Sequence, residues 1–153
     1  MKKPIFLLFV LSLLFSCDED DIDCSAVDCV GFPSLNFELL LDGQNALGEN
    51  LLTLEEISLS GDHPEPTELD SFNVSTSATT ETQILVLSSF AWEEKTYDFN
   101  LNIGSEYTSN IVAEVERTSS GGCCGGIPFI KSLEIDGQPI QNPNTLISLN
   151  ITL

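Results

Sequence analysis

Apolar and polar residues alternate with a period of two along much of this chain. The alternation occupies residues 35–42, 97–103 and 147–153. The middle segment is the clearest example, with four apolar residues separated by three polar ones: Tyr97, Phe99, Leu101 and Ile103 by Asp98, Asn100 and Asn102. Successive side chains of a β-strand point to opposite faces of its sheet, so each segment is predicted to be a strand with one buried and one wet face. The chain is therefore expected to fold mainly as β structure.

Five further segments are rich in strand-forming residues: 55–60, 71–76, 83–90, 110–117 and 129–136. Residues 84–87 are apolar on both faces, which favours a central strand. Turn-forming residues separate the segments: Asp42-Gly43, Ser60-Gly61-Asp62, Asp136-Gly137, Pro139 and Pro143. Residues 44–54 have room for one helical turn, but their glycine favours a loop, and no amphipathic helix is expected. Residues 32–153 are thus predicted to form one domain, a single antiparallel β-sandwich of seven or eight strands.

The first sixteen residues, MKKPIFLLFVLSLLFS, have the pattern of a secretory signal peptide. Lys2 and Lys3 precede an apolar run at 5–15. This run of about eleven residues is too short to span a bilayer core, which needs about 20 residues in a helix. Residues 1–16 are therefore predicted to be a lipoprotein signal peptide that is removed and plays no part in the fold.

The end of this run, LLFSC, resembles the lipobox of bacterial lipoproteins. Leu14, Ser16 and Cys17 match the motif, whereas Phe15 is bulkier than the residue usual at its position. The resemblance implies that acyl chains such as palmitate are attached at Cys17 and that the chain is cut before it. Two or three acyl chains are enough for a stable anchor. The expected partner of this end of the protein is therefore a membrane.

An acidic run, DEDDID, follows Cys17. Its like charges repel one another, so residues 17–31 are predicted to form a solvated tether. The run also resembles the export signal of surface lipoproteins of the Bacteroidota, which implies an outer-membrane location with exposure at the cell surface. In other Gram-negative bacteria an aspartate after the cysteine would imply retention at the inner membrane. The run lacks the glycine turn and distant glutamate of a calcium loop, so no metal site is expected there.

The chain is strongly acidic, with 24 acidic and five basic residues. Without residues 1–16, three basic residues remain against 24 acidic ones, and the net charge is −21. Those three are Lys95, Arg117 and Lys131. Such a surface repels phosphate backbones and anionic headgroups, so nucleic acid is excluded as a partner.

A sparse set of positions across most of the mature chain resembles small surface lipoproteins of the Bacteroidota. The order is C-x4-C, then F-x-L-x-x-D-G-x-N, then strands, CCGG and a strand that ends in D-G: Cys24, Cys29, Phe37, Leu39, Asp42, Gly43, Asn45, Cys123 and Cys124. The resemblance implies an immunoglobulin-like or transthyretin-like sandwich. It implies no particular activity. The two DGQ tripeptides, 42–44 and 136–138, are better explained by shared hairpin chemistry than by duplication.

Export would place the four remaining cysteines in an oxidising compartment, where thiols are usually paired: Cys24, Cys29, Cys123 and Cys124. A bridge between adjacent cysteines is unfavourable, because their Cα atoms lie about 3.8 Å apart and disulfides usually need about 4.4–6.8 Å. The favoured pairing joins Cys123 and Cys124 each to Cys24 or Cys29. The alternative pairs Cys24 with Cys29 and Cys123 with Cys124. A zinc site is disfavoured, since two adjacent cysteines are unlike the usual structural spacing.

The sequence holds no recognisable catalytic constellation. His63 is the only histidine, and it lies in GDHPEP, a loop by composition, where a solvated side chain is expected. Pairs such as Glu55-Glu56 and Glu93-Glu94 are expected by chance in so acidic a chain. Neither a G-x-S-x-G nor an H-E-x-x-H motif is present. The protein is predicted not to be an enzyme and to use no cofactor or metal.

Trp92 is the one candidate for a ligand contact. It lies in AWEEK, at a predicted hairpin tip, where an exposed ring could stack on a sugar together with Tyr107. Phe90 and Tyr97 are expected to lie in the core. The leading hypothesis is a non-catalytic outer-membrane lipoprotein that binds or assists an unknown envelope protein. The alternative is a surface module for glycans or cations, with Trp92 or the acidic loops as contacts.

Overall fold

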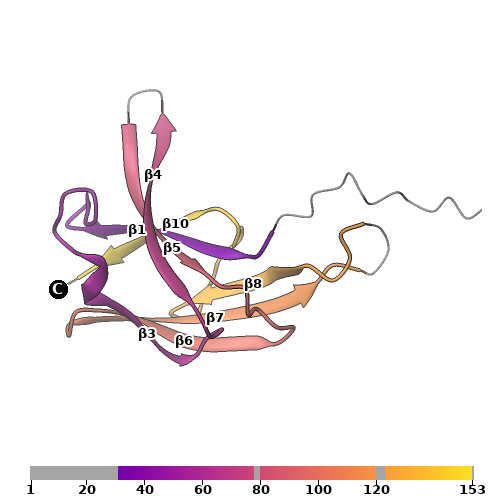
Figure 1. The fold of residues 1–153 in the computed structure, drawn as a ribbon. Coiled ribbons are helices and arrows are strands. Elements are labelled where there is room, and N and C mark those ends of the chain that lie inside the picture. The colour runs from indigo at the N-terminus through magenta and orange to yellow at the C-terminus, as the bar shows by residue number, and fades with distance from the viewer. Residues whose placement is uncertain (1–30, 78–79, 120–122, 153) are drawn as a thin grey trace, which may run out of the picture.

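The computed structural model describes residues 31–77, 80–119 and 123–152, and these fold into two stacked sheets (Figure 1). Sheet A has the order β10-β1-β5-β4, with β2 beside β1: β1 (Ser34–Leu41), β2 (Gln44–Asn45), β4 (Glu68–Ser77), β5 (Thr80–Ser88) and β10 (Leu146–Ile151). Sheet B has the order β3-β6-β7-β8-β9: β3 (Ile57–Asp62), β6 (Thr96–Ile103), β7 (Tyr107–Arg117), β8 (Pro128–Ile135) and β9 (Gln138–Pro139). One short 3-10 helix, η2 (Leu54–Glu56), precedes β3.

The predicted all-β sandwich is confirmed. Eight of the described strands have six or more residues, and β2 and β9 have two each. The pairing differs from the prediction in one place, because β1 and β10 run parallel, from Asn36 opposite Leu146 to Leu41 opposite Ile151. Parallel neighbours need a long connection, and here nearly the whole domain lies between the two strands.

The alternation in sequence becomes the core in the structure. In β6 the residues Tyr97, Phe99, Leu101 and Ile103 are all buried, while the intervening polar residues face outward. Strands of both sheets contribute to one continuous apolar cluster, which includes Leu35, Phe37 and Leu39 from β1 and Ile111, Ala113 and Val115 from β7. Burial of this shared face is the main force holding the two sheets together.

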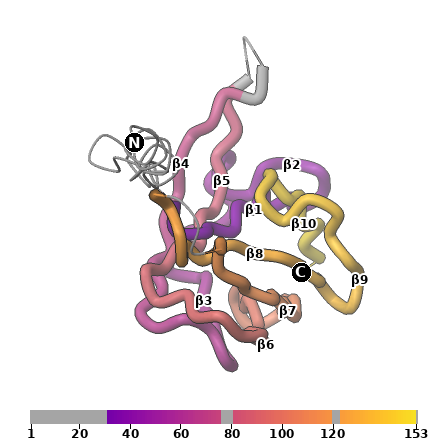
Figure 2. The backbone as a smooth tube through the Cα atoms, turned by 90° about the vertical axis from the view of Figure 1, so that its right-hand side faces the viewer, coloured from indigo at the N-terminus to yellow at the C-terminus, as the bar shows by residue number. Residues whose placement is uncertain are grey.

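The strand β5 is central, as its apolar run predicts, because it lies between β1 and β4. Leu85 and Leu87 belong to the core cluster. Ile84 points to the other face of the sheet but is also buried. The β4–β5 hairpin extends beyond the rest of sheet A (Figure 2), since β5 pairs with β1 only from Leu85 to Ser88.

Both DGQ tripeptides form the same tight hairpin, in agreement with the sequence analysis. Asp42 and Gly43 have φ values of 50° and 78°, and Asp136 and Gly137 have values of 51° and 71°. Two successive left-handed residues define a type I′ turn, whose twist matches that of the flanking strands. A backbone bond follows each turn at 2.8 Å, from Ala46 N to Leu39 O and from Ile140 N to Leu133 O.

Two local predictions were wrong, and a third was incomplete. Ser60-Gly61-Asp62 is no turn but the end of β3, paired in regular register with β6. Pro139 lies in the two-residue strand β9, at the edge of sheet B, where a proline costs no ladder hydrogen bond. Residues 44–54 form a loop that contains the helical turn considered from the sequence, in which Glu49 N donates to Asn45 O and Leu51 N to Ala46 O, but the strand β2 at its start was not predicted.

Position 61 of the strand requires glycine, because the backbone of β6 passes very close to it. A Cβ there would lie 2.9 Å from Asp98 O and 3.0 Å from Phe99 Cα, and its φ is +100°. Gly137 has a similar φ of +71°, but nothing lies within 4 Å of its Cβ position. Only Gly61 therefore combines conformational strain with a clash against backbone atoms.

We predict that Gly61→Ala lowers the free energy of unfolding by about 2–4 kcal/mol, whereas Gly137→Ala lowers it by about 1–2 kcal/mol. The difference reflects displacement of the β6 backbone in the first variant alone. Urea unfolding followed by far-UV circular dichroism measures both. Equal losses for the two variants would contradict the close approach at Gly61.

Candidate functional site: the end of the sandwich where β1 begins

Residues 89–95 connect sheet A to sheet B across one end of the sandwich. The sequence predicted a hairpin here, but β5 belongs to sheet A and β6 to sheet B, so the chain crosses between them. Ser89 fixes the start of the crossing, because its buried hydroxyl donates to Pro66 O at 2.6 Å and accepts from Ala91 N at 3.0 Å. This crossing decides where the neighbouring aromatic residues point.

Trp92 is buried, with 1% of its surface exposed, and it belongs to the core cluster. Its Nε1 donates a hydrogen bond of 2.8 Å to the carbonyl oxygen of Pro33, the residue before β1. Its ring packs edge-to-face on Tyr97, with ring centroids 5.0 Å apart. The expectation of an exposed Trp92 was therefore wrong. A buried indole offers no stacking surface to a sugar, so this ligand contact is withdrawn.

Phe90 differs from its prediction in the opposite direction to Trp92. It was expected in the core, yet 73% of its surface is exposed. Its ring lies edge-to-face against Phe32, which is 54% exposed, with centroids 4.7 Å apart. Phe90 lies two residues beyond the end of β5, in the crossing segment, so the alternation within the strand does not extend to it.

Arg117 links this end of the sandwich to the loop between β7 and β8. One guanidinium nitrogen donates to Trp92 O at 3.2 Å and another to Gly126 O at 2.5 Å. A hydrogen-bonded series therefore runs from Pro33 through Trp92 and Arg117 to Gly126. Sequence reasoning assigned no role to Arg117, because nothing local signals a side chain that bonds to two distant carbonyls.

Cys123 and Cys124 lie in this loop and are partly buried. Thr118 holds the loop together, since its hydroxyl donates to Cys124 O at 2.8 Å and accepts from Ile127 N at 3.1 Å. Two backbone bonds close the same turn, from Thr118 N to Ile127 O and from Gly126 N to Thr118 O. Cys17, Cys24 and Cys29 lie outside the described residues, so the pairing of the cysteines stays a prediction.

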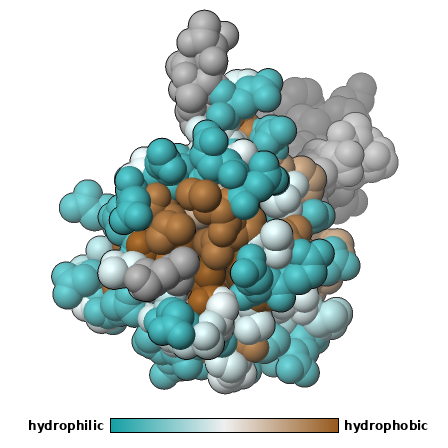
Figure 3. All heavy atoms as spheres, turned by 90° about the vertical axis from the view of Figure 1, so that its left-hand side faces the viewer, coloured by the Kyte–Doolittle hydropathy of each residue, from teal (hydrophilic) through white to brown (hydrophobic). Residues whose placement is uncertain are grey.

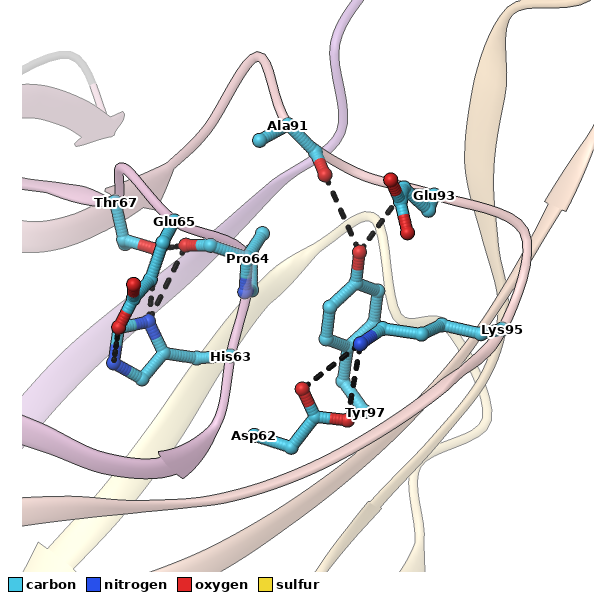
Figure 4. A network of polar contacts seen from close by, with 9 residues as sticks. All are labelled: Asp62, His63, Pro64, Glu65, Thr67, Ala91, Glu93, Lys95 and Tyr97. Atoms are coloured by element: carbon cyan, nitrogen blue, oxygen red, sulfur yellow. Dashed lines mark hydrogen bonds and ion pairs between the residues drawn. The ribbon is translucent and has the colours of Figure 1, made fainter.

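A polar network flanks the crossing segment on the side of β3 (Figure 4). The Tyr97 hydroxyl accepts from Glu93 N at 2.8 Å and donates to Ala91 O at 3.3 Å. Lys95 Nζ lies 2.8 Å from Asp62 Oδ1 and 4.4 Å from the centre of the Tyr97 ring. The hydrogen bond to Asp62 raises the pKa of Lys95. These contacts fix the path of the chain from Ala91 to β6.

His63 packs into its own loop and is not a solvated side chain as expected. Its Nδ1 lies 3.2 Å from Pro64 O and 3.3 Å from Thr67 Oγ1, and its Nε2 lies 3.9 Å from a Glu65 carboxylate oxygen. Its ring also packs edge-to-face against the ring of Phe99, with centroids 6.3 Å apart. The imidazole therefore serves the local structure of the loop.

The third basic side chain, Lys131, bridges two acidic neighbours on the outer face of sheet B. Its Nζ lies 2.6 Å from Glu116 and 3.0 Å from Glu114. The hydrogen bond to Glu116, followed by that to Glu114, raises the pKa of Lys131, and the bond from Lys131 lowers the pKa of Glu114. Lys95, Arg117 and Lys131 are thus all engaged within the fold, and most of the described acidic side chains have no basic partner.

The described residues hold no metal-binding cluster, pocket or membrane-spanning helix. No group of three or more His, Cys, Asp or Glu side chains in that part of the chain is arranged to hold a metal ion, and it has no pocket. None of its helices is long and apolar enough to cross a membrane. Tyr107, suggested as a partner of Trp92 in sugar stacking, is half-buried, and burial raises the pKa of its hydroxyl.

An apolar area ringed by hydrophilic residues lies on the side of the molecule that faces left in Figure 1 (Figure 3). This side is far from the start of β1, which lies to the right in Figure 1. The apolar area and the crossing segment thus lie at opposite ends of the sandwich.

No protein family, curated protein or solved structure matches the chain. The immunoglobulin-like or transthyretin-like character of the sandwich therefore stays a prediction.

We predict that Trp92→Phe lowers the free energy of unfolding by about 1–3 kcal/mol, because it removes the bond to Pro33 O and leaves that acceptor without its donor. Far-UV circular dichroism during urea unfolding measures the change. Phe72→Leu, on the exposed face of β4, is the control and should change stability by less than about 0.5 kcal/mol. A Trp92→Phe protein as stable as the control would refute the role assigned to this hydrogen bond.

Proposed function

We propose that this protein is a lipid-anchored, non-catalytic β-sandwich module of the outer membrane, displayed at the cell surface, which binds or assists another envelope component. The observation that carries the proposal is the sequence LLFSCDEDDID at 13–23, in which a lipobox cysteine is followed directly by an acidic run. The sandwich is the displayed part, and the segment from Cys17 to Gly31 is its tether.

The chemistry of the domain supports a binding or accessory role rather than catalysis. The one histidine is engaged by Pro64, Thr67 and Glu65 within its own loop. The one tryptophan is buried and holds the fold. The acidic surface keeps neighbouring copies apart through like-charge repulsion and disfavours anionic partners.

We also propose that Cys123 and Cys124 are joined to Cys24 and Cys29. The support is positional. The loop that holds Cys124 is connected through Arg117 and Trp92 to Pro33. Cys29 precedes Pro33 by only four residues, which span at most about 14 Å. A bridge closing a loop of about 100 residues would stabilise the domain by roughly 4–5 kcal/mol in the chain-entropy model.

Metabolic labelling with palmitate in a Gram-negative host tests the anchor. We expect the wild-type chain to incorporate label and to lose exposed epitopes when intact cells are treated with protease. Cys17→Ala should abolish labelling, because the thiol that accepts the lipid is gone. An unlabelled wild-type chain would contradict lipidation, and a labelled chain that resists protease on intact cells but not on lysed cells would contradict surface display.

Tryptic digestion without reduction tests the pairing. Trypsin cuts after Lys95, Arg117 and Lys131, so the peptide 118–131 carries both Cys123 and Cys124, and a separate peptide ending at Lys95 carries Cys24 and Cys29. We expect these two peptides to be recovered as one linked species that separates on reduction. Two unlinked peptides, each lighter by two hydrogens than after reduction, would establish the alternative pairing.

A further inference from the structure

The most exposed aromatic rings at the tether end of the domain form a single unit. Phe32 is 54% exposed and Phe90 is 73% exposed, and their rings contact each other edge-to-face with centroids 4.7 Å apart. The backbone beneath them is held in place, because Pro33 accepts the Trp92 hydrogen bond and Ser89 bonds to Pro66 O. The pair is therefore a firmly supported apolar projection.

We infer that the Phe32–Phe90 pair inserts into the lipid surface to which the protein is anchored. The inference rests on the proposed function, because it requires the anchor at Cys17. Phe32 directly follows the predicted tether, and Gly31 lies fourteen positions after Cys17. Fully extended, that tether reaches about 50 Å, and disulfides to Cys123 and Cys124 would shorten the free part. The end that carries the two rings is thus the end that the anchor holds nearest the bilayer.

The chemistry of the pair fits a lipid interface. Phenylalanine has no polar atom to satisfy, so its ring gains free energy on leaving water for the boundary between headgroups and acyl chains. Anchoring removes most of the entropic cost of bringing the rings to the surface, so two side chains suffice where they would not bind a membrane alone. The contact orients the domain, with the apolar area of Figure 3 facing away from the start of β1.

The charges around the pair select the type of lipid. Glu93 and Glu94 follow Phe90 closely and are exposed, and the guanidinium of Arg117 is engaged with two carbonyl oxygens. Carboxylates near the surface repel anionic headgroups. Contact with the lipid surface is therefore expected to weaken as its content of anionic headgroups rises. The competing occupant is the tether itself, whose Val27 and Val30 could cover the rings in water.

The single tryptophan of the chain makes the contact measurable without a label. Trp92 lies two residues from Phe90 and bonds to the residue after Phe32. The protein is expressed with its own signal, and the lipidated product is reconstituted in phosphatidylcholine vesicles. Its Trp92 fluorescence is compared between plain vesicles and vesicles of bromine-labelled phosphatidylcholine. We expect about a twofold loss of Trp92 fluorescence in the brominated vesicles, since interfacial apolar groups lie about 5–10 Å inside the boundary.

The variant Phe32→Ser/Phe90→Ser should stay with the vesicles but lose most of this quenching. Phe72→Ser is the matched control, because Phe72 is 53% exposed but lies on β4 opposite Ile84, and its quenching should equal that of the wild type. Replacing a third of the phosphatidylcholine with phosphatidylglycerol should weaken the quenching of the wild type.

Anchored protein with no quenching, or with equal quenching in the double variant, would overturn the inference and favour the tether as occupant. Loss of vesicle association in Cys17→Ala alone tests the anchor separately, and a wild-type protein that fails to associate would refute the proposed function instead.

Discussion

The burial of Trp92 holds one end of the sandwich together. Its Nε1 bonds to the residue before β1, its ring packs on Tyr97 of β6, and its carbonyl accepts from Arg117 at the end of β7. One residue in a sheet-to-sheet crossing thereby joins both sheets and the cysteine loop. An aliphatic side chain would fill the same space but would not specify the partner, because a buried indole N–H must find an acceptor. The placement of Phe90 and Phe32 follows from this arrangement.

The three basic side chains of the domain are all held in contacts within the fold. Lys95 bonds to Asp62, Lys131 bridges Glu114 and Glu116, and Arg117 bonds to backbone carbonyls. These exposed ion pairs contribute little to stability. Their larger effect is on the exterior, because they leave the other carboxylates without compensating charge. Such a surface repels other copies of the domain and anionic partners, and the exposed Phe32–Phe90 pair is an uncharged part of it.

Patterns that depend on near neighbours in the chain were predictable. The alternation at 97–103 gives the buried and wet faces of β6, and the two Asp-Gly pairs give matching type I′ turns. Predictions failed where a distant strand decides the outcome. Ser60-Gly61-Asp62 has the composition of a turn, but these residues pair with β6 as part of a strand. The glycine is needed there because the β6 backbone leaves no room for a side chain. Arg117 carried no signal, because its acceptors come from two other segments.

The sequence by itself determined that this is an all-β chain, and it placed most of the strands and both Asp-Gly hairpins. It also carries the lipobox-like motif on which the proposed address depends. Only the tertiary structure decided that Phe90 projects while Trp92 is buried, although two residues separate them. The physical reason is that alternation specifies opposite faces within one strand but not the sheet to which the next strand belongs. Once the chain crosses from sheet A to sheet B, long-range packing sets which ring enters the core.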